Sequence, residues 1–418
     1  MRVGRPPGAL PLLILAGCML DAGQETGVSI SDSAGVSIVI NTAPRWATTT
    51  PWRLSENPAL EIGAVDGEPA YLFDRVVGAI TLSDGQIAVA DMGSAQIRVF
   101  DPTGKHLISF GAEGDGPGEF RQVIGLHRLP GDAIAVIDRL DRLHVFDSSG
   151  AYRETLRIGT LPVALDPLTY HENPPRDIRV VGWLQDGTFL AWESSHIVWN
   201  EQRQFEQAQT LEFEYSRYSM DPSPLNTIVR IAGPTFQPHP MNLVLRTVFA
   251  PEVLSSTDDE HLVLGLSGSG EVRWYDDDGQ LVRISRREWP MRPVTEETID
   301  EFVAQSSPRI SEELLRGRTF ADALPKFSGL LCDRPGNVWL RRYEPDHAAM
   351  TLEYVRTFDT TSSWAVLDTT GRWLGDLTTP RRFSPLEIGD DYVLGLYRDE
   401  FEVEYTRVYT LTKPDQAP

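Results

Sequence analysis

The sequence has few cysteines and few basic residues, and both shortages exclude classes of protein. Cys18 and Cys332 are its two cysteines in 418 residues, whereas a secreted fold stabilised by disulfides carries an even set of closely spaced cysteines. We therefore expect no disulfide framework. The 38 Lys and Arg residues stand against 60 Asp and Glu, which gives a formal net charge of −22. Because binding to nucleic acid or to acidic lipid needs excess positive charge, we expect neither as a partner.

Long apolar runs are also missing from the body of the chain. The run over residues 9–17 is shorter than the roughly 20 residues that cross a bilayer, and no later window is apolar enough. We therefore expect no membrane-spanning segment.

The first residues have the order of an export signal. Arg2 and Arg5 precede the apolar run, and the small residues Ala16 and Gly17 end it, as in secretory signal peptides. Leu15-Ala16-Gly17-Cys18 resembles the lipobox of bacterial lipoproteins. The resemblance implies that residues 1–17 are a signal peptide, that Cys18 carries a lipid, and that the protein is extracytoplasmic, attached to the inner or outer membrane. A plain signal peptide with Cys18 near its cleavage site is the alternative.

Residues 18–50 are expected to form a tether and an N-terminal extension, because residues 19–35 are rich in Ser, Gly, Asp and Ala. With Cys18 lipidated, Cys332 has no partner. It belongs to the apolar, strand-like run 328–333, so we expect a small buried hydrophobic residue, with a reactive thiol as the alternative.

Glycine and proline are plentiful, with 34 and 30 copies. Each costs a helix interior about 1 to 3 kcal/mol, so many short strands joined by turns are a better expectation than a helical fold. The chain is 41% apolar, which argues against disorder.

A repeat runs through the body of the chain. Residues 78–91 are similar to 125–138, and the segments that follow, 97–104 and 143–150, are similar to each other. Each unit has four strand-like runs separated by turns, often with glycine, which allows the positive φ of tight turns. The first turn recurs at Asp84-Gly85, Pro130-Gly131, Asp186-Gly187, Asp258-Asp259, Pro335-Gly336 and Asp390-Asp391, and the second at residues 101–104, 147–150, 276–279 and 368–371.

Six four-stranded units with a period of about 50 residues are typical of a β-propeller. The segment 61–73 resembles 109–120, which ends the first unit, while the last unit, 383–411, has three runs. We therefore predict an all-β fold, a six-bladed β-propeller over residues 51–413, closed by an N-terminal strand that completes the last blade.

Two insertions interrupt the repeat. Residues 196–248 are rich in aromatic residues and predict a long hairpin and loop in or after the third blade. Residues 295–317 predict a small helical insertion, because Thr295 can cap a helix, and Ile299 and Phe302 have helical spacing. We expect both insertions over one face or at the rim of the ring.

The pattern Ile87–Asp91, Gln96–Asp101 and Gly116–Phe120 resembles the NHL repeat of six-bladed propeller lipoproteins of bacteria. The resemblance covers residues 76–159. It implies that two carboxylate and arginine pairs bind one another and the turn backbone; they become candidate binding residues if they line the mouth of the central channel. These residues are Asp91, Arg98, Asp138 and Arg142.

Patterns for catalysis and metal binding are weak. A zinc site needs three or four converging ligands, whereas the eight histidines are far apart in the sequence. The acids of residues 276–279 are contiguous, whereas a calcium loop spaces them alternately. Six-bladed lactonases and arylesterases use asparagine to hold a calcium ion in the channel, and asparagine is scarce in this sequence. We therefore predict no catalytic residue, no metal ligand and no cofactor, with calcium as the alternative.

The aromatic residues of 196–248 and the helix over 295–303 favour a binding function. We expect a lipid-anchored, monomeric binding scaffold that takes a protein, peptide or small molecule at a propeller face. The alternative is a metal-dependent hydrolase or lyase, lactonase-like, with its site in the central channel.

Overall fold

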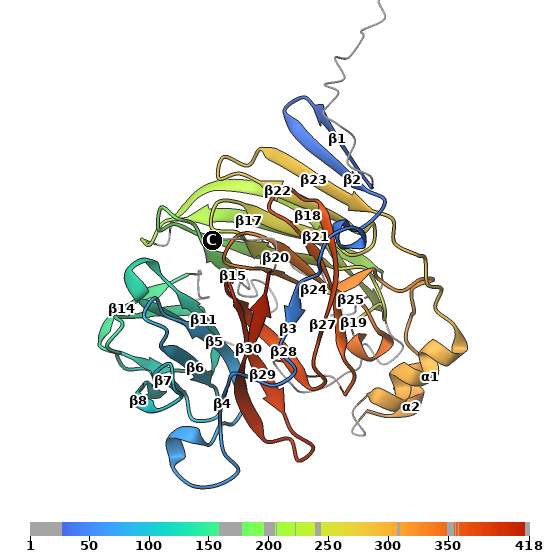
Figure 1. Ribbon diagram of the computed structural model, residues 1–418. Helices are drawn as coiled ribbons and strands as arrows, with labels where there is room; N and C mark the ends of the chain where they lie inside the picture. Colours follow the sequence, from blue (N-terminus) through green and yellow to red (C-terminus); the bar gives the residue numbers. More distant parts are fainter. Residues whose placement is uncertain are drawn as a thin grey trace, which may run out of the picture.

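The computed structural model describes residues 27–158, 178–195, 205, 207–221, 223–238, 244–306, 310–348, 355, 357 and 359–413. Cys18 and the predicted signal peptide lie outside this part of the chain. Six sheets surround a common centre like the blades of a propeller (Figure 1). The predicted all-β, six-bladed architecture is therefore confirmed.

Each blade begins with its innermost strand and continues outward through hydrogen-bonded neighbours. Blade 1 contains β5 (Val76–Thr81), β6 (Ile87–Asp91), β7 (Gln96–Phe100) and β8 (His106–Phe110), and blade 2 contains β11 (Val123–Arg128), β12 (Ile134–Asp138), β13 (Arg142–Phe146) and β14 (Tyr152–Arg157). Blade 3 contains β15 (Ile178–Trp183), β16 (Phe189–Ser194), β17 (Gln209–Tyr218), β18 (Pro224–Pro238) and β19 (Val244–Arg246).

The other three blades follow the same order. Blade 4 contains β20 (Val253–Thr257), β21 (Leu262–Leu266), β22 (Glu271–Tyr275) and β23 (Leu281–Arg287), and blade 5 contains β24 (Phe327–Cys332), β25 (Val338–Arg342), β26 (Ser362–Leu367) and β27 (Trp373–Thr379). Blade 6 contains β28 (Phe383–Ile388), β29 (Tyr392–Arg398) and β30 (Glu404–Thr412). A short parallel pair, β9 (Ala112–Glu113) and β10 (Glu119–Phe120), lies between blades 1 and 2.

Six apolar clusters fill the six seams between neighbouring blades. A middle strand therefore packs on both faces, and β6, β7, β12 and β13 are buried at nearly every position. This explains why runs such as residues 87–90 are apolar at every position instead of alternating. Stability of this fold depends on blade-to-blade packing.

All the predicted turns connect strands of one blade. In the second turns of blades 1, 2, 4 and 5, the first Asp accepts hydrogen bonds from the amides two and four residues later, at 2.7 to 3.1 Å. Asp101 is an example, and the hydrogen bond from the Thr103 hydroxyl lowers its pKa. Part of the acidity of the chain thus serves turn geometry.

The ring closes as predicted. β3 (Arg53–Leu54) and β4 (Leu60–Ile62) both pair antiparallel with β30 and complete blade 6. Ile62 is buried in the seam between blades 6 and 1, and Arg407 binds Glu61 at 2.6 Å. Segments from the two ends of the propeller therefore share one blade.

A hairpin that the sequence patterns did not reveal precedes the ring. β1 (Val28–Ser33) and β2 (Val36–Asn41) extend the outer edge of blade 4, where β2 runs parallel to β23. Buried Asn41 donates to Ser285 Oγ and to the Gly371 carbonyl, both at 3.1 Å, and its Oδ1 accepts from the Trp373 amide. Asn41 thereby joins blades 4 and 5.

Both insertions form, and the first becomes part of a blade. β17 and β18 are a long hairpin within blade 3. The second insertion holds α1 (Glu296–Gln305) and α2 (Glu312–Arg316), and Thr295 caps α1 in a capping box. Phe302 packs against Phe249 and Phe320. Single-turn 3₁₀ helices occur at Arg45–Ala47, Pro69–Tyr71, Pro130–Asp132 and Pro345–Ala348. Over the described residues, no helix is both long and apolar enough to cross a membrane.

Candidate functional site

The two faces of the propeller carry different connections. One face, here called the turn face, holds the turns after the first strand of every blade and after the third strand of blades 1 to 5. The opposite insert face holds the loops after the second strand, the crossings between blades, and the helices α1 and α2 (Figure 1). The insert face is the one with long, variable segments, where binding sites are commonly built.

The four residues expected to pair do so, at the insert-face ends of blades 1 and 2. Arg98 Nη2 lies 2.8 Å from Asp91 Oδ2, and Arg142 Nη2 lies 2.6 Å from Asp138 Oδ2. All four side chains are buried. Burial raises the pKa of Asp91, against the opposing charge of Arg98. For Asp138, burial also acts to raise the pKa, but hydrogen bonds from its partners outweigh burial and lower the pKa to about 2.

Blade 6 has an equivalent pair that sequence reasoning missed. Arg398 ends the second strand and Glu404 begins the third, and their side chains meet at 2.7 Å. Glu404 also accepts from the Val76 amide of blade 1, and Arg398 donates to the Val355 carbonyl. Because the basic residue comes first here, the Asp-then-Arg pattern of blades 1 and 2 does not find this pair.

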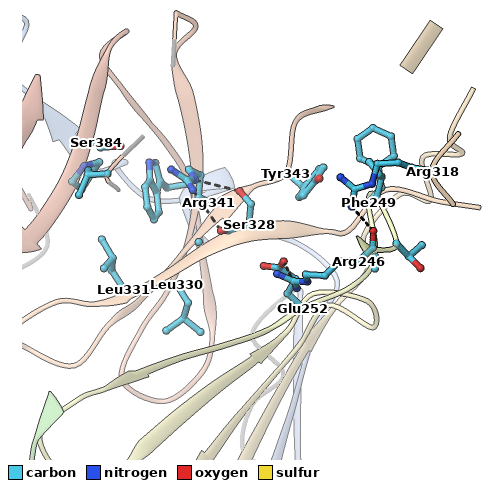
Figure 2. Close-up of a pocket in the computed structure, with 17 residues that line it drawn as sticks. Arg246, Phe249, Glu252, Arg318, Ser328, Leu330, Leu331, Arg341, Tyr343 and Ser384 are labelled. Atoms are coloured by element: carbon cyan, nitrogen blue, oxygen red, sulfur yellow. Dashed lines mark hydrogen bonds and ion pairs between the residues drawn. The ribbon is translucent and has the colours of Figure 1, made fainter. Parts of the chain in front are cut away.

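A cavity of about 550 Å³, the insert-face cavity, lies between the crossing from blade 3 to blade 4, the insertion, and strands of blades 5 and 6. None of the four predicted binding residues lines it. Its walls come from the crossing between blades 3 and 4, from the insertion, from the ends of β24, β25 and β28, and from β26 (Figure 2). The residues are Arg246, Thr247, Val248, Phe249, Ala250, Glu252, Arg318, Ser328, Gly329, Leu330, Leu331, Arg341, Tyr343, Val355, Trp364, Ser384 and Pro385.

Charged side chains of the cavity are mostly arginines. Arg341 Nε donates to Ser328 Oγ at 3.2 Å, and its guanidinium lies 5.8 Å from the centre of the Trp364 ring. Arg318 Nη2 donates to the Arg246 carbonyl at 2.5 Å. Burial and the nearby charge of Arg246 lower the pKa of Arg318. The cavity therefore has positively charged groups in its walls.

The apolar wall depends on the helical insertion. Phe249 contacts Phe302 of α1 with ring centres 5.8 Å apart, and contacts Tyr343 at 6.4 Å. Phe249 also has φ of 61°, a left-handed conformation that is strained for a bulky residue. The insertion thus holds Phe249 in the cavity wall in a conformation that a free loop would avoid.

A second cavity, the turn-face cavity, has a volume of about 470 Å³ and lies at the ends of the inner strands β11, β15, β20, β24 and β28. Arg334 binds Glu387 at 3.0 Å, and Asp259 lies nearby. Burial raises the pKa of Asp259, and neighbouring Asp258 raises it further. Cys332, expected to be buried, is half-buried and lines this cavity, and desolvation by its surroundings raises the pKa of its thiol.

The described residues contain no group of three or more His, Cys, Asp or Glu side chains that could hold a metal ion. Two histidines have shifted acidities. Burial lowers the pKa of His127 to about 4, and a hydrogen bond with Asp258 raises the pKa of His261.

Comparisons with known proteins agree on the architecture. A family model described as a 6-bladed beta-propeller (DUF5128) matches residues 73–264. No curated protein matches the chain significantly. A solved member of the duf4221 family from Bacteroides vulgatus has 11% sequence identity and a TM-score of 0.50, over 87% of this chain and 99% of that one.

Two further solved structures are more distant. A candidate exported protein from Bacteroides fragilis has 11% identity and a TM-score of 0.46, over 86% of this chain and 98% of that one. Virginiamycin B lyase from Staphylococcus aureus has 9% identity and a TM-score of 0.40, over 87% and 100%. The blades, the family match and the duf4221 structure together identify this protein as a six-bladed β-propeller.

Proposed function

We propose that this protein is a binding scaffold whose ligand, a small molecule or a side chain of a peptide, occupies the insert-face cavity. The cavity itself carries the proposal. Its volume of about 550 Å³ lies within the range of about 300–1,000 Å³ that ligand sites occupy. Like such sites, it combines apolar and aromatic walls with a few polar groups.

The position of Phe249 supports the same conclusion. Strained backbone persists only where the surroundings hold it, and it gathers at ligand sites. Phe249 is held by rings of the insertion and of Tyr343. The helical insertion therefore supports the cavity wall.

The polar groups of the cavity favour binding over catalysis. A general acid or base must reach the reacting group through a hydrogen bond. Glu252 is the one carboxylate among the described lining residues, and Arg246 binds it at 2.7 Å. The arginines are suited to recognising a ligand and to orienting it.

We further propose that the propeller is a monomeric lipoprotein of the NHL-like kind, held outside the cytoplasm by a lipid on Cys18. The lipobox-like Leu15–Cys18 segment and the repeat pattern of residues 76–159 support this. A lipid anchor would keep the insert-face cavity close to a membrane surface while the propeller itself stays in water.

Native mass spectrometry of the full-length protein, released from its own membrane in mild detergent, tests the binding function. We expect a bound small molecule on the wild type and its loss from Ala250→Trp, because the indole would occupy the cavity. Val65→Trp adds the same ring at an exposed site (70% accessible) and is the matched control. A wild type without adduct, or an adduct that Ala250→Trp retains, would refute the assignment.

A further inference from the structure

The charges around the insert-face cavity indicate the chemistry of its occupant. Arg246, Arg318 and Arg341 line it, against the single carboxylate of Glu252 among the described lining residues. This local excess of positive charge occurs in a chain whose net charge is −22. Clefts lined by one sign of charge concentrate ligands of the opposite sign.

Arg341 is the arginine whose side chain is best oriented to bind an acidic group of a ligand. The hydrogen bond to Ser328 and the nearby Trp364 ring orient its guanidinium, and Ser384 of the next blade lines the cavity on the same side (Figure 2). Arg341 Nη2 also donates to the Ser328 carbonyl at 3.5 Å, so a carboxylate would share this guanidinium with Ser328 and be bound through the paired N–H donors of Nη1 and Nη2. Ser384 could add a hydroxyl donor from the facing blade.

Arg318 and Arg246 add positive charge at the other end of the cavity (Figure 2). Arg318 is held against the backbone of Arg246. Because Arg246 is already paired with Glu252 at 2.7 Å, Arg318 is the cation at this end that a bound anion could approach.

The rest of the lining is suited to hydrocarbon. Phe249, Leu330 and Leu331 line the cavity, and half-buried Leu331 could bury further apolar surface against an apolar ligand. We infer that the occupant is an organic anion, with an apolar body and one acidic group that Arg341 binds as it would bind a carboxylate. This inference rests on the proposed binding function and names its ligand class.

A matched pair of fluorescent probes tests the inference. The probes are 8-anilinonaphthalene-1-sulfonate, an apolar anion, and N-phenyl-1-naphthylamine, the same rings without the acidic group. They are titrated into the chain from residue 19 onward, which contains all six blades. We expect the anion to bind more tightly than the neutral probe, and Arg341→Gln to weaken the anion at least about tenfold while leaving the neutral probe within about twofold.

Control variants distinguish the loss of a positive charge in the cavity from a loss of folding. Arg153→Gln removes an exposed arginine of blade 2 (63% accessible) and should change neither titration. Arg318→Gln should weaken only the anion, so the test does not depend on Arg341→Gln folding. Thermal unfolding of each variant shows whether the fold is intact.

Two outcomes distinguish a failure of the anion inference from a failure of the proposed binding function. Equal binding of both probes, lost together in Ala250→Trp and unchanged in Arg341→Gln and Arg318→Gln, would overturn the anion inference and leave the binding function in place. Binding of both probes that Ala250→Trp leaves unchanged would overturn both, because the probes would then lie outside the cavity.

Discussion

Arg142 shows what one buried side chain contributes to this fold. It binds Asp138 through Nε and Nη2, and it also donates to the Gly114 carbonyl in the crossing from blade 1. Asp138 in turn accepts from the Arg121 amide, where the chain enters blade 2. The pair therefore ties one blade to the segment that leads into it.

Removing Arg142 should be costly, because Asp138 would remain buried without its partner. We expect Arg142→Ala to lower the free energy of unfolding by about 3–5 kcal/mol. Arg153→Ala, which breaks an exposed pair with Asp147 in the same blade, should change it by less than about 1 kcal/mol. Urea unfolding of both variants measures the difference, and similar losses would contradict the structural role.

His127 should make stability depend on pH. Its pKa is about 4 in the folded protein and about 6.5 when unfolded, so the unfolded chain binds the proton first as the pH falls. The free energy of unfolding should therefore decrease between about pH 6.5 and pH 4. His127→Gln should reduce this decrease in urea titrations at pH 7 and pH 5.

His261 provides a control of opposite sign. Because its pKa is raised, the folded state binds the proton first as the pH falls. This protonation stabilises the folded state below about pH 6.5, and the stabilisation is lost as the pH rises through the folded pKa. His261→Gln should steepen the loss of stability in acid. The same sign for both variants would contradict these environments.

Cys18 lies outside the described residues, but its proposed lipid makes a direct prediction. Cys18→Ser should release the protein from the membrane, because a thioether-linked lipid cannot form on serine. Fractionation followed by immunoblotting measures this. A variant that still sediments with membranes would contradict lipid attachment at Cys18.

At the level of elements, the helical insertion supports the insert-face cavity. Phe302 of α1 is fully buried and contacts Phe249 in the cavity wall. Folding of α1 and the shape of the cavity should therefore depend on each other.

Phe302→Ala tests this dependence. Loss of a buried phenylalanine costs about 3–5 kcal/mol, so we expect faster hydrogen exchange over 296–305 and weaker binding of the naphthalene probes. Phe401→Ala, at a residue with 77% exposure, is the matched control and should change neither. Unchanged exchange in α1 would show that the insertion does not depend on this contact.

At the level of the whole molecule, stability depends on closing the ring. β4 covers the outer edge of β30 and places Ile62 in the seam with blade 1. Without it, the edge of blade 6 would be open to pairing with other chains.

Two truncations compare closure with the additional hairpin. A chain that begins at residue 65 lacks β3 and β4 and should aggregate or lose cooperative unfolding. A chain that begins at residue 43 lacks only β1 and β2 and should remain monomeric, with a smaller loss of stability. Size-exclusion chromatography and thermal unfolding measure both. Equal behaviour of the two chains would contradict closure by the N-terminal strands.

Most of the ring could be predicted because its signals are local. Turns such as Asp101–Gly104 repeat because each hairpin needs the same backbone geometry. Closure of the ring by an N-terminal strand could be predicted because residues 61–73 resemble the end of the first unit. The helical insertion was predictable from Thr295 and the spacing of Ile299 and Phe302.

Other features depend on contacts between distant segments. The β1–β2 hairpin is held by blade 4 and by Asn41, and the reversed Arg398–Glu404 pair is recognisable only by its position in blade 6.

The sequence by itself determined the number of blades, the turns and the closing strand, because each is specified within a few residues or by repetition. Tertiary structure alone decided where a ligand could bind. Arg246, Arg318 and Arg341 lie far apart in the chain and share no motif. They meet because the ring brings the end of blade 3 close to blade 5 and the insertion adds Arg318. Their proximity depends on packing between blades, and no local sequence pattern predicts that packing.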